Sequence, residues 1–378
     1  MIRGAGAARA PMFATGALRL YSPTDLQRTT AALFATRLVT HLCAPTFILL
    51  AGVSARFVAR RRTPKGASLF LLSRGAWLVL LQLTVIRFAW NFDPGFHYNS
   101  SNIISTIGFC MMMLAGLIHL PPGAILAFGL ALCVGHHALD PLAFADRSFA
   151  DVLRSFLHVK KFYALGGGYS FLFLYPLIPW VGVMALGYCL GRIYEKDWSP
   201  GERKDALFWM GGASLFAFLG LRWANIYGDP LRWSPQARPA LTGMSFLNVE
   251  KYPPSLLYLC LTLGVTLLLL GALEGRSLLR WRPIVIYGRV AFFYYVAHLF
   301  LIHLVAMAAV VLSGYPWRTT IFLGSQAQAS PLLKGRFGLG LGVTYGVWAA
   351  IVLLLYPLCA RWNALKERHK GSVWVSYV

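Results

Sequence analysis

Two histidines in long apolar segments are the first residues of this sequence that could do chemistry. His41 lies in the segment Thr40–Gly52, and His298 lies in the segment Gly288–His303. An ionisable side chain at membrane depth is costly, so it is a functional candidate by default. A neutral imidazole can accept a proton from a nucleophile near neutral pH, which makes both histidines candidate general bases. The alternative for each is a structural role, in which the ring bonds to a backbone carbonyl or a neighbouring helix.

The residues around His298 suggest further roles. Tyr294 lies four residues before His298, so the two side chains share one face of a helix. A tyrosine in that place is a candidate for stabilising a developing oxyanion. Arg289 lies nine residues before His298, about 13 Å away along a continuous helix. His303 points elsewhere, so the pattern does not predict a two-histidine metal face, and no metal is expected.

Two further segments combine polar residues with helix-breaking ones. Lys251 and Tyr252 precede two prolines that suit the start of a helix. Both are candidates for binding a substrate, with an anchor at the membrane interface as the alternative for Lys251. The segment Tyr175–Trp180 contains two prolines, which are predicted to break or kink a helix. Three glycines that follow it allow close contact between helices: Gly182, Gly187 and Gly191.

These candidates belong to a chain that is built to cross a membrane. It has 378 residues, of which 57% are hydrophobic and only 13% charged, with a mean hydropathy of +0.60. A soluble domain has roughly twice that charged fraction. We predict an all-α, polytopic helical transmembrane bundle without a separate soluble domain. Nine spans are expected, at residues 34–56, 68–90, 103–120, 123–139, 170–193, 206–224, 254–273, 284–312 and 338–360.

The net charge of +22 indicates membrane topology and anionic headgroups rather than nucleic acid, with an anionic cytoplasmic ligand as the alternative. The cations cluster in the loops after spans one, five, seven and nine, whereas Asn91–Asn102 has no Lys or Arg. Basic loops face the cytoplasm, so we expect a protein of the cell (inner) membrane with a cytoplasmic C-terminus. The six cysteines lie singly in apolar segments and predict neither a disulfide framework nor a zinc site.

This topology leaves the N-terminus on the outer side, although it is basic and lacks a signal peptide. We therefore expect a tenth helix encoded upstream of Met1, and we expect the 378-residue chain to be inactive or unstable without it. The chain divides into a poorly ordered segment at 1–20, one membrane domain at 21–365 and a cytoplasmic tail at 366–378.

Four segments together resemble the bacterial membrane proteins related to heparan-alpha-glucosaminide N-acetyltransferase, a family of transmembrane acyltransferases. They are THLCAPTFILLAG at 40–52, YPLIPW at 175–180, KYPPSL at 251–256 and GRVAFFYYVAH at 288–298. The resemblance covers roughly residues 21–365. His41 stands where the lysosomal enzyme has an acidic active-site residue, and Ala31 stands where that enzyme has its catalytic histidine.

The resemblance implies acyl transfer across a membrane. Acetyl-CoA or a related acyl-CoA is the co-substrate on the cytoplasmic side, and an acceptor, which can be a sugar, is approached from the other side. His41 or His298 would then act as the base, with Tyr294 at the oxyanion and Lys251 and Tyr252 at the acceptor. Arginines near the cytoplasmic ends of the helices are candidates for the CoA phosphates: Arg56, Arg280, Arg282 and Arg289.

Two other functions stay open at this point. A transporter of an anionic or glycan-linked substrate would use the buried histidines as a proton relay and the broken fifth span as a gate. A non-catalytic remnant or subunit would keep the fold without the reaction. The expected partners are the lipid bilayer, an acyl-CoA and an unknown acceptor such as a glycan. The sequence leaves a homodimer open.

Overall fold

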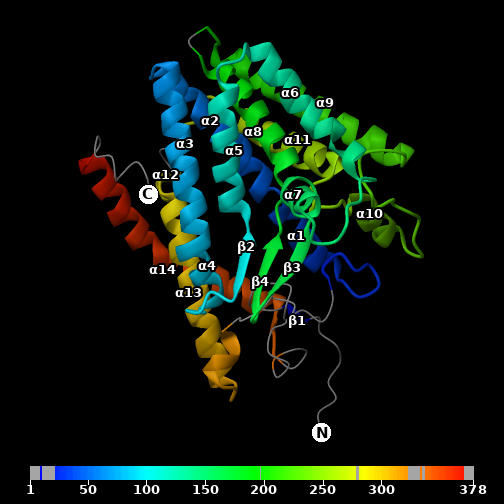
Figure 1. The fold of residues 1–378 in the computed structure, drawn as a ribbon, viewed down its shortest axis with the longest axis vertical. Helices are drawn as coiled ribbons and strands as arrows, with labels where there is room; N and C mark the ends of the chain where they lie inside the picture. The colour runs from blue at the N-terminus through cyan, green and yellow to red at the C-terminus, as the bar shows by residue number, and fades with distance from the viewer. Residues whose placement is uncertain are drawn as a thin grey trace.

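The computed structural model describes residues 9–10, 22–195, 197–277, 281–321, 333 and 337–369. Candidate residue Arg280, most of the segment predicted at 1–20 and most of the tail predicted at 366–378 lie outside these residues. Within them, eight helical segments are long and apolar enough to cross a membrane: Ala31–Arg60, Pro64–Asn91, Pro122–Leu139, Leu177–Tyr194, Pro200–Ala224, Leu256–Leu273, Ala291–Leu312 and Leu341–Arg368. A shorter apolar helix, Ile103–Leu117, corresponds to the remaining predicted span. The predicted all-α polytopic bundle is therefore confirmed (Figure 1).

The helices follow one another along the chain. The first half contains α1 (Ala31–His41), α2 (Cys43–Arg60), α3 (Pro64–Leu81), a π-helical turn (Gln82–Ile86), α4 (Arg87–Asn91), α5 (Ile103–Leu117), α6 (Pro122–Gly135) and α7 (Phe149–Leu157). The second half contains α8 (Leu177–Leu190), α9 (Pro200–Ala224), α10 (Pro239–Leu247), α11 (Leu256–Leu273), α12 (Arg282–Arg289), α13 (Ala291–Leu312) and α14 (Leu341–Arg368). Side chains cap many of these helices; Ser255, for example, accepts a hydrogen bond from the backbone of Tyr258 at the start of α11.

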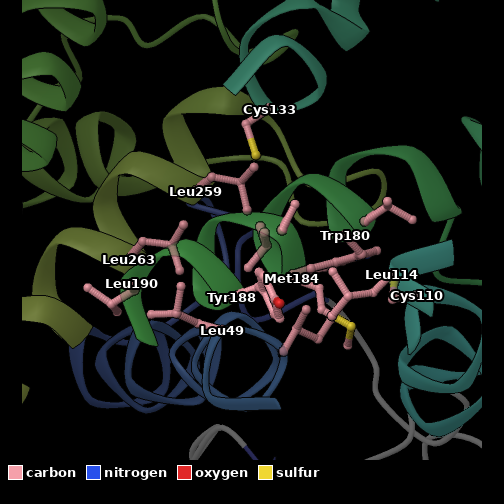
Figure 2. Close-up of a cluster of buried hydrophobic side chains, with 14 of the residues drawn as sticks. Leu49, Cys110, Leu114, Cys133, Trp180, Met184, Tyr188, Leu190, Leu259 and Leu263 are labelled. Carbon is pink, nitrogen blue, oxygen red and sulfur yellow. The ribbon is translucent and has the colours of Figure 1, made fainter. Parts of the chain in front are cut away.

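Helix α8 lies at the centre of the main hydrophobic core. Trp180, Met184 and Tyr188 are buried along it, and side chains of α2, α5, α6 and α11 surround them (Figure 2). Glycines let α2 and α8 approach each other closely. A Cβ built on Gly187 would lie 2.1 Å from the carbonyl oxygen of Leu49, so no larger residue fits at this crossing. The predicted packing role of the glycines in this span is therefore confirmed at Gly187.

A small sheet covers one end of the bundle. Strand β4 (Tyr169–Phe173) pairs in parallel with β2 (Tyr98–Ser101) and antiparallel with β3 (Lys161–Gly166). We call this end, with the loops at 92–102, 140–176 and 225–255, the sheet face (Figure 1). A separate two-stranded pair joins β1 (Arg9–Ala10) to β5 (Leu339–Gly340).

The sheet corrects the prediction of a helix over residues 170–193. Residues Tyr169–Phe173 form the middle strand of the sheet, and the helix begins only at Leu177. Pro176 lies just before the helix and Pro179 lies in its first turn, where a missing N–H costs no helical hydrogen bond. The two prolines therefore lie where the predicted helix is broken, and the helix that is present starts at them.

Two other predicted spans are divided. The predicted first span, 34–56, lies within the helical segment Ala31–Arg60, in which Leu42 separates α1 from α2. The predicted eighth span, 284–312, is two helices, because Val290 has a non-helical backbone (φ −121°, ψ 29°) between α12 and α13. Arg289 therefore ends α12 and does not share a continuous helix with His298, so the predicted separation of about 13 Å along one helix does not apply.

The opposite end of the bundle carries the basic loops, and we call it the basic face. Ion pairs link its helices: Arg56 and Arg60 contact Glu195, Arg203 contacts Glu274, and Arg289 contacts Glu367. The loops predicted to lie on one side thus lie together, as do those of the sheet face.

Candidate active site

His41, at the end of α1, is buried in the protein with only 3% of its surface exposed. Among the described residues, neither its Nδ1 nor its Nε2 atom has a hydrogen-bond partner. Its backbone carbonyl is occupied, because the Tyr258 hydroxyl donates to it at 2.8 Å. The Tyr258 ring also contacts the imidazole edge-to-face, with centroids 5.3 Å apart. The histidine is thus held in place through its backbone and ring face, while both nitrogens are left for another group.

A second buried donor lies close to the same tyrosine. Trp180 in α8 is completely buried, and its Nε1–H has no acceptor among the described residues. Its ring lies 6.5 Å from that of Tyr258 and 5.8 Å from that of Tyr175. Buried polar atoms without partners are uncommon in folded proteins and call for an explanation. An indole N–H and an imidazole left unpaired around one tyrosine are what a site for a polar ligand would contain.

Tyr175 and Tyr252 join this group from two loops of the sheet face. Their hydroxyls lie 3.2 Å apart, and their rings meet edge-to-face. Burial raises the pKa of Tyr175 well above its ordinary value. Burial also acts to raise the pKa of Tyr252, but the positive charge of Lys251, the hydrogen bond with Tyr175 and the charge of Arg37 together outweigh it and lower that pKa. We call His41, Tyr175, Trp180, Tyr252 and Tyr258 the polar centre.

Three cations surround the polar centre. The ammonium groups of Lys251 and Lys160 lie 5.3 Å and 5.6 Å from the ring centroid of Tyr252. Arg37 lies one helical turn before His41 and is close enough to act electrostatically on both His41 and Lys251. Lys251 is only 8% exposed, and burial lowers its pKa from the ordinary value, with the charge of Arg37 acting in the same direction. The structure therefore brings together three of the predicted site residues: His41, Lys251 and Tyr252.

The other predicted histidine has a different environment. The Nδ1 atom of His298 lies 3.0 Å from the backbone carbonyl of Tyr294, and the two rings stack with centroids 5.1 Å apart. The prediction that Tyr294 and His298 share a face is confirmed. Because the imidazole is bonded to its own helix, the arrangement fits the structural alternative for His298 as well as a catalytic one. The ring of Tyr295 lies 5.5 Å from His298 on another side.

Three of the predicted phosphate-binding arginines, Arg56, Arg282 and Arg289, are described by the structure; they lie at the basic face and differ in what they contact. Arg56 donates two hydrogen bonds to Glu195, at 2.6 Å and 2.9 Å, and its guanidinium lies over the Tyr188 ring. Arg289 is exposed and reaches Glu367 at 3.4 Å. Arg282 is exposed at the start of α12. In the described part of the chain Arg282 makes no carboxylate contact, so of these three charges it is the most accessible to an anion.

Sequence reasoning missed Arg37, Lys160 and Tyr258. The sequence did contain a sign that Arg37 belongs to the site, since Arg37 lies four residues before His41 and so on the same helix face. The sequence contained no such sign for Lys160 and Tyr258, because a strand pairing and a helix crossing bring these two residues to the site from distant segments. The position of Tyr258, one turn after the cap of α11, is what places its hydroxyl at the His41 carbonyl.

The fold defines a multi-pass helical membrane protein. The family model described as heparan-alpha-glucosaminide N-acetyltransferase, catalytic, matches residues 13–227, which is more than half of the chain. The chain belongs to this family. Comparison with curated proteins and with solved structures found no match. The matched region includes His41, Lys160 and Trp180, whereas Lys251 and His298 lie beyond it.

Proposed function

We propose that this protein transfers an acyl group from an acyl-CoA, such as acetyl-CoA, to a hydroxyl or amine of an acceptor, and that His41 is the general base. The acceptor heteroatom attacks the thioester carbonyl, its proton passes to an imidazole nitrogen of His41, and the carbon–sulfur bond breaks. The thiolate of CoA leaves, and the proton returns to it or to solvent. The products are the acylated acceptor and free CoA.

The observation that carries this proposal is the state of the His41 side chain. A general base must offer a nitrogen lone pair to the proton that it removes. His41 has two ring nitrogens without partners in the described structure. Trp180, whose ring packs against the same tyrosine, has an unpaired indole N–H of the kind that can donate to a developing oxyanion. His298 supports the role less well, because one of its nitrogens already bonds to the Tyr294 carbonyl.

The charges at the two ends of the bundle support a direction for the reaction. Basic loops face the cytoplasm in membrane proteins, so the basic face is proposed to be cytoplasmic, in the cell membrane. Arg282 and Arg289 would meet the phosphates of the donor there, and the acceptor would reach the polar centre from the sheet face. A sugar is one acceptor of the required chemistry, since it offers hydroxyl or amine groups.

Acyl transfer in sided membrane vesicles tests this proposal. Labelled acetyl-CoA is supplied to one face and a set of amino sugars to the other, and covalent acetylation is measured by mass spectrometry. His41→Gln should lower turnover about 10²- to 10⁴-fold, the usual contribution of a general base. The matched control is His119→Gln, because His119 is exposed at the basic face and bonds to Ser68.

Two outcomes would contradict the proposal. Turnover of the His41→Gln variant within about twofold of the unmodified protein would remove His41 as the base. Uptake of an unmodified sugar into the vesicles without any acetylation would instead identify a transporter, the alternative that the sequence left open.

A further inference from the structure

Three histidines gather at the sheet face, outside the polar centre. His136 and His137 follow α6 directly, and His158 follows α7. The ring centroid of His136 lies 4.2 Å from that of His137 and 5.8 Å from that of His158. Asp140 joins two of these rings, because its carboxylate contacts His137 Nδ1 at 2.9 Å and His158 Nε2 at 2.6 Å. The proposed reaction gives this cluster no role.

His137 connects the cluster to the start of α11. Its Nε2 atom accepts a hydrogen bond from the backbone N–H of Leu256, the first residue of that helix, at 3.3 Å. The first N–H groups of a helix have no partner inside the helix, so each depends on an acceptor from elsewhere. Further acceptors at this helix end are the Gly228 carbonyl and the Ser255 hydroxyl. His137 is thus one of the groups that fix the N-terminus of α11.

The position of this helix end sets the geometry of the polar centre. Tyr258 lies in the first turn of α11, and its hydroxyl donates to the backbone carbonyl of His41 at 2.8 Å. Its ring also packs against the rings of His41 and Trp180. A displacement of the N-terminus of α11 therefore displaces the tyrosine that holds the candidate base.

The contact between His137 and Leu256 requires a neutral imidazole. A nitrogen that accepts a hydrogen bond carries no proton, so these partners assign the proton of the ring to Nδ1, which donates to Asp140. Protonation of Nε2 turns the acceptor into a donor that faces another N–H. It also places a positive charge at a helix N-terminus, where the macrodipole disfavours cations. Both effects weaken the hold of His137 on α11.

The surroundings of His137 favour it as the place where a proton enters the cluster. The titratable and charged groups around its contact with Leu256 are His136 and Asp140 of its own segment, His158 and Arg154 of α7 and its end, and Tyr227 and Asp229 of the loop after α9. Asp140 is 47% exposed, so the solution at the sheet face reaches the cluster. Burial lowers the pKa of His158, although the hydrogen bond with Asp140 acts in the opposite direction. His137 is the less buried of the two histidines that Asp140 contacts.

We propose that His137 is a positioning residue for acyl transfer. In its neutral form it holds the N-terminus of α11 in the place that supports His41, and protonation from the sheet face releases this support. The protein is thus competent while the solution at the sheet face is neutral, and it loses turnover as that solution becomes acidic. The effect on turnover rests on the proposed function, whereas the effect on the end of α11 can be measured alone.

Hydrogen exchange followed by mass spectrometry tests the contact without any reaction. The purified full-length protein in nanodiscs is compared at about pH 8 and about pH 5, the limits between which a histidine changes its charge. Exchange of the amides at 256–258 is corrected for its intrinsic dependence on pH. Acidification should then raise this exchange about three- to tenfold, because one hydrogen bond of ordinary net strength is lost.

Two substitutions of His137 separate the contact from its titration. His137→Gln offers an amide oxygen that accepts a hydrogen bond but does not titrate, so exchange at 256–258 should stay slow at both pH values. His137→Leu removes the acceptor and should give fast exchange at both. His97→Gln is the matched control, because His97 contacts Asp93 and the Tyr169 ring on the same face, and this variant should respond to pH as the unmodified protein does.

Turnover in sided vesicles tests the link to His41. Labelled acetyl-CoA and glucosamine are supplied on opposite faces, and one face at a time is acidified. Acidification of the sheet face should lower the turnover of the unmodified protein. His137→Gln should keep its turnover at neutral pH and lose it only at lower pH, whereas His137→Leu should lower kcat about three- to tenfold at every pH.

The outcomes separate this inference from the proposed function. Exchange at 256–258 that does not respond to pH in the unmodified protein, or that responds equally in His137→Gln, overturns the inference. A pH profile of turnover that His137→Gln leaves unchanged overturns the positioning role, even where exchange behaves as expected. The expected exchange in a protein without acyl transfer confirms the pH-dependent contact and refutes the proposed function.

Discussion

Replacing His41 by leucine should abolish acyl transfer without lowering the stability of the protein. The imidazole is buried, and the described structure gives no hydrogen bond to either of its nitrogens. A buried polar atom without a partner costs about 1–3 kcal/mol of folding free energy. An apolar side chain of similar size removes that cost, so His41→Leu is expected to be neutral or to stabilise the fold by up to about that amount. Most substitutions of core residues act in the opposite direction.

The structural support of His41 is unaffected by this substitution. The Tyr258 hydroxyl donates to the backbone carbonyl of residue 41, which leucine retains. The edge contact with the Tyr258 ring is lost, at a cost of roughly 0.5–1.5 kcal/mol, which partly offsets the gain. Tyr258→Phe is the complementary variant, since it keeps the ring and removes the hydrogen bond, and it should destabilise the protein by about 1 kcal/mol.

Thermal unfolding in detergent and acetyl transfer are measured on the same preparations. The reasoning predicts that His41→Leu keeps the unfolding temperature and loses turnover, whereas Tyr258→Phe lowers the unfolding temperature. A drop in unfolding temperature for His41→Leu that exceeds the drop for Tyr258→Phe would refute it. That result would mean that the imidazole nitrogens make hydrogen bonds that stabilise the fold.

Three further predictions test other parts of the structure. Gly187→Ala should destabilise the protein by about 1–3 kcal/mol, because the added methyl group would meet the backbone of Leu49. Gly212→Ala is the control and should leave stability unchanged, because the space around Gly212 is open. Thermal unfolding of both variants checks this. Burial acts to raise the pKa of Asp93, but hydrogen bonds from His97 and Arg87 lower that pKa overall. The ionised Asp93 therefore stabilises the fold above the ordinary aspartate pKa, and this stabilisation is lost as pH falls through the lowered pKa. Asp93→Asn should therefore be less stable at neutral pH and should unfold with a weaker acid dependence, seen in pH-resolved melting curves. His298→Ala should lower turnover less than His41→Gln does, and an equal or larger loss in the same vesicle assay would return the role of base to His298.

The sequence predicted the helices well because each span is a long apolar run with polar ends. It failed at Tyr169–Phe173, which is as apolar as the helix that follows. Whether such a short run becomes strand or helix depends on its neighbours, and here β2 and β3 supply the hydrogen bonds that make it a strand. The break at Val290 was missed because Val290 and Ala291 are ordinary residues of an apolar run, and Gly288 two residues earlier lies inside α12.

The site was predicted in part. His41 and Lys251 stood out because ionisable residues are rare in and beside apolar segments, and the structure places both at the polar centre. Their partners could not be found in this way. Tyr258 is an ordinary aromatic residue of an apolar helix, and Lys160 is one of many surface cations. Only the packing of α11 against α1 and the path of the loop before β3 give them a role.

The regions around His41 and around His298, which the sequence singled out, are linked through tyrosines. Tyr295 of α13 contacts the ring of His298. It is also near enough to Tyr175 to add to the rise of that phenol's pKa, after burial, Tyr252 and Tyr258. Tyr175 in turn bonds to Tyr252, whose ring lies near the ammonium groups of Lys160 and Lys251. His298 therefore lies at the far end of a row of polar rings that leads to the polar centre. Such a place suits a residue that positions Tyr295, and through it Tyr175, more than one that takes the proton itself.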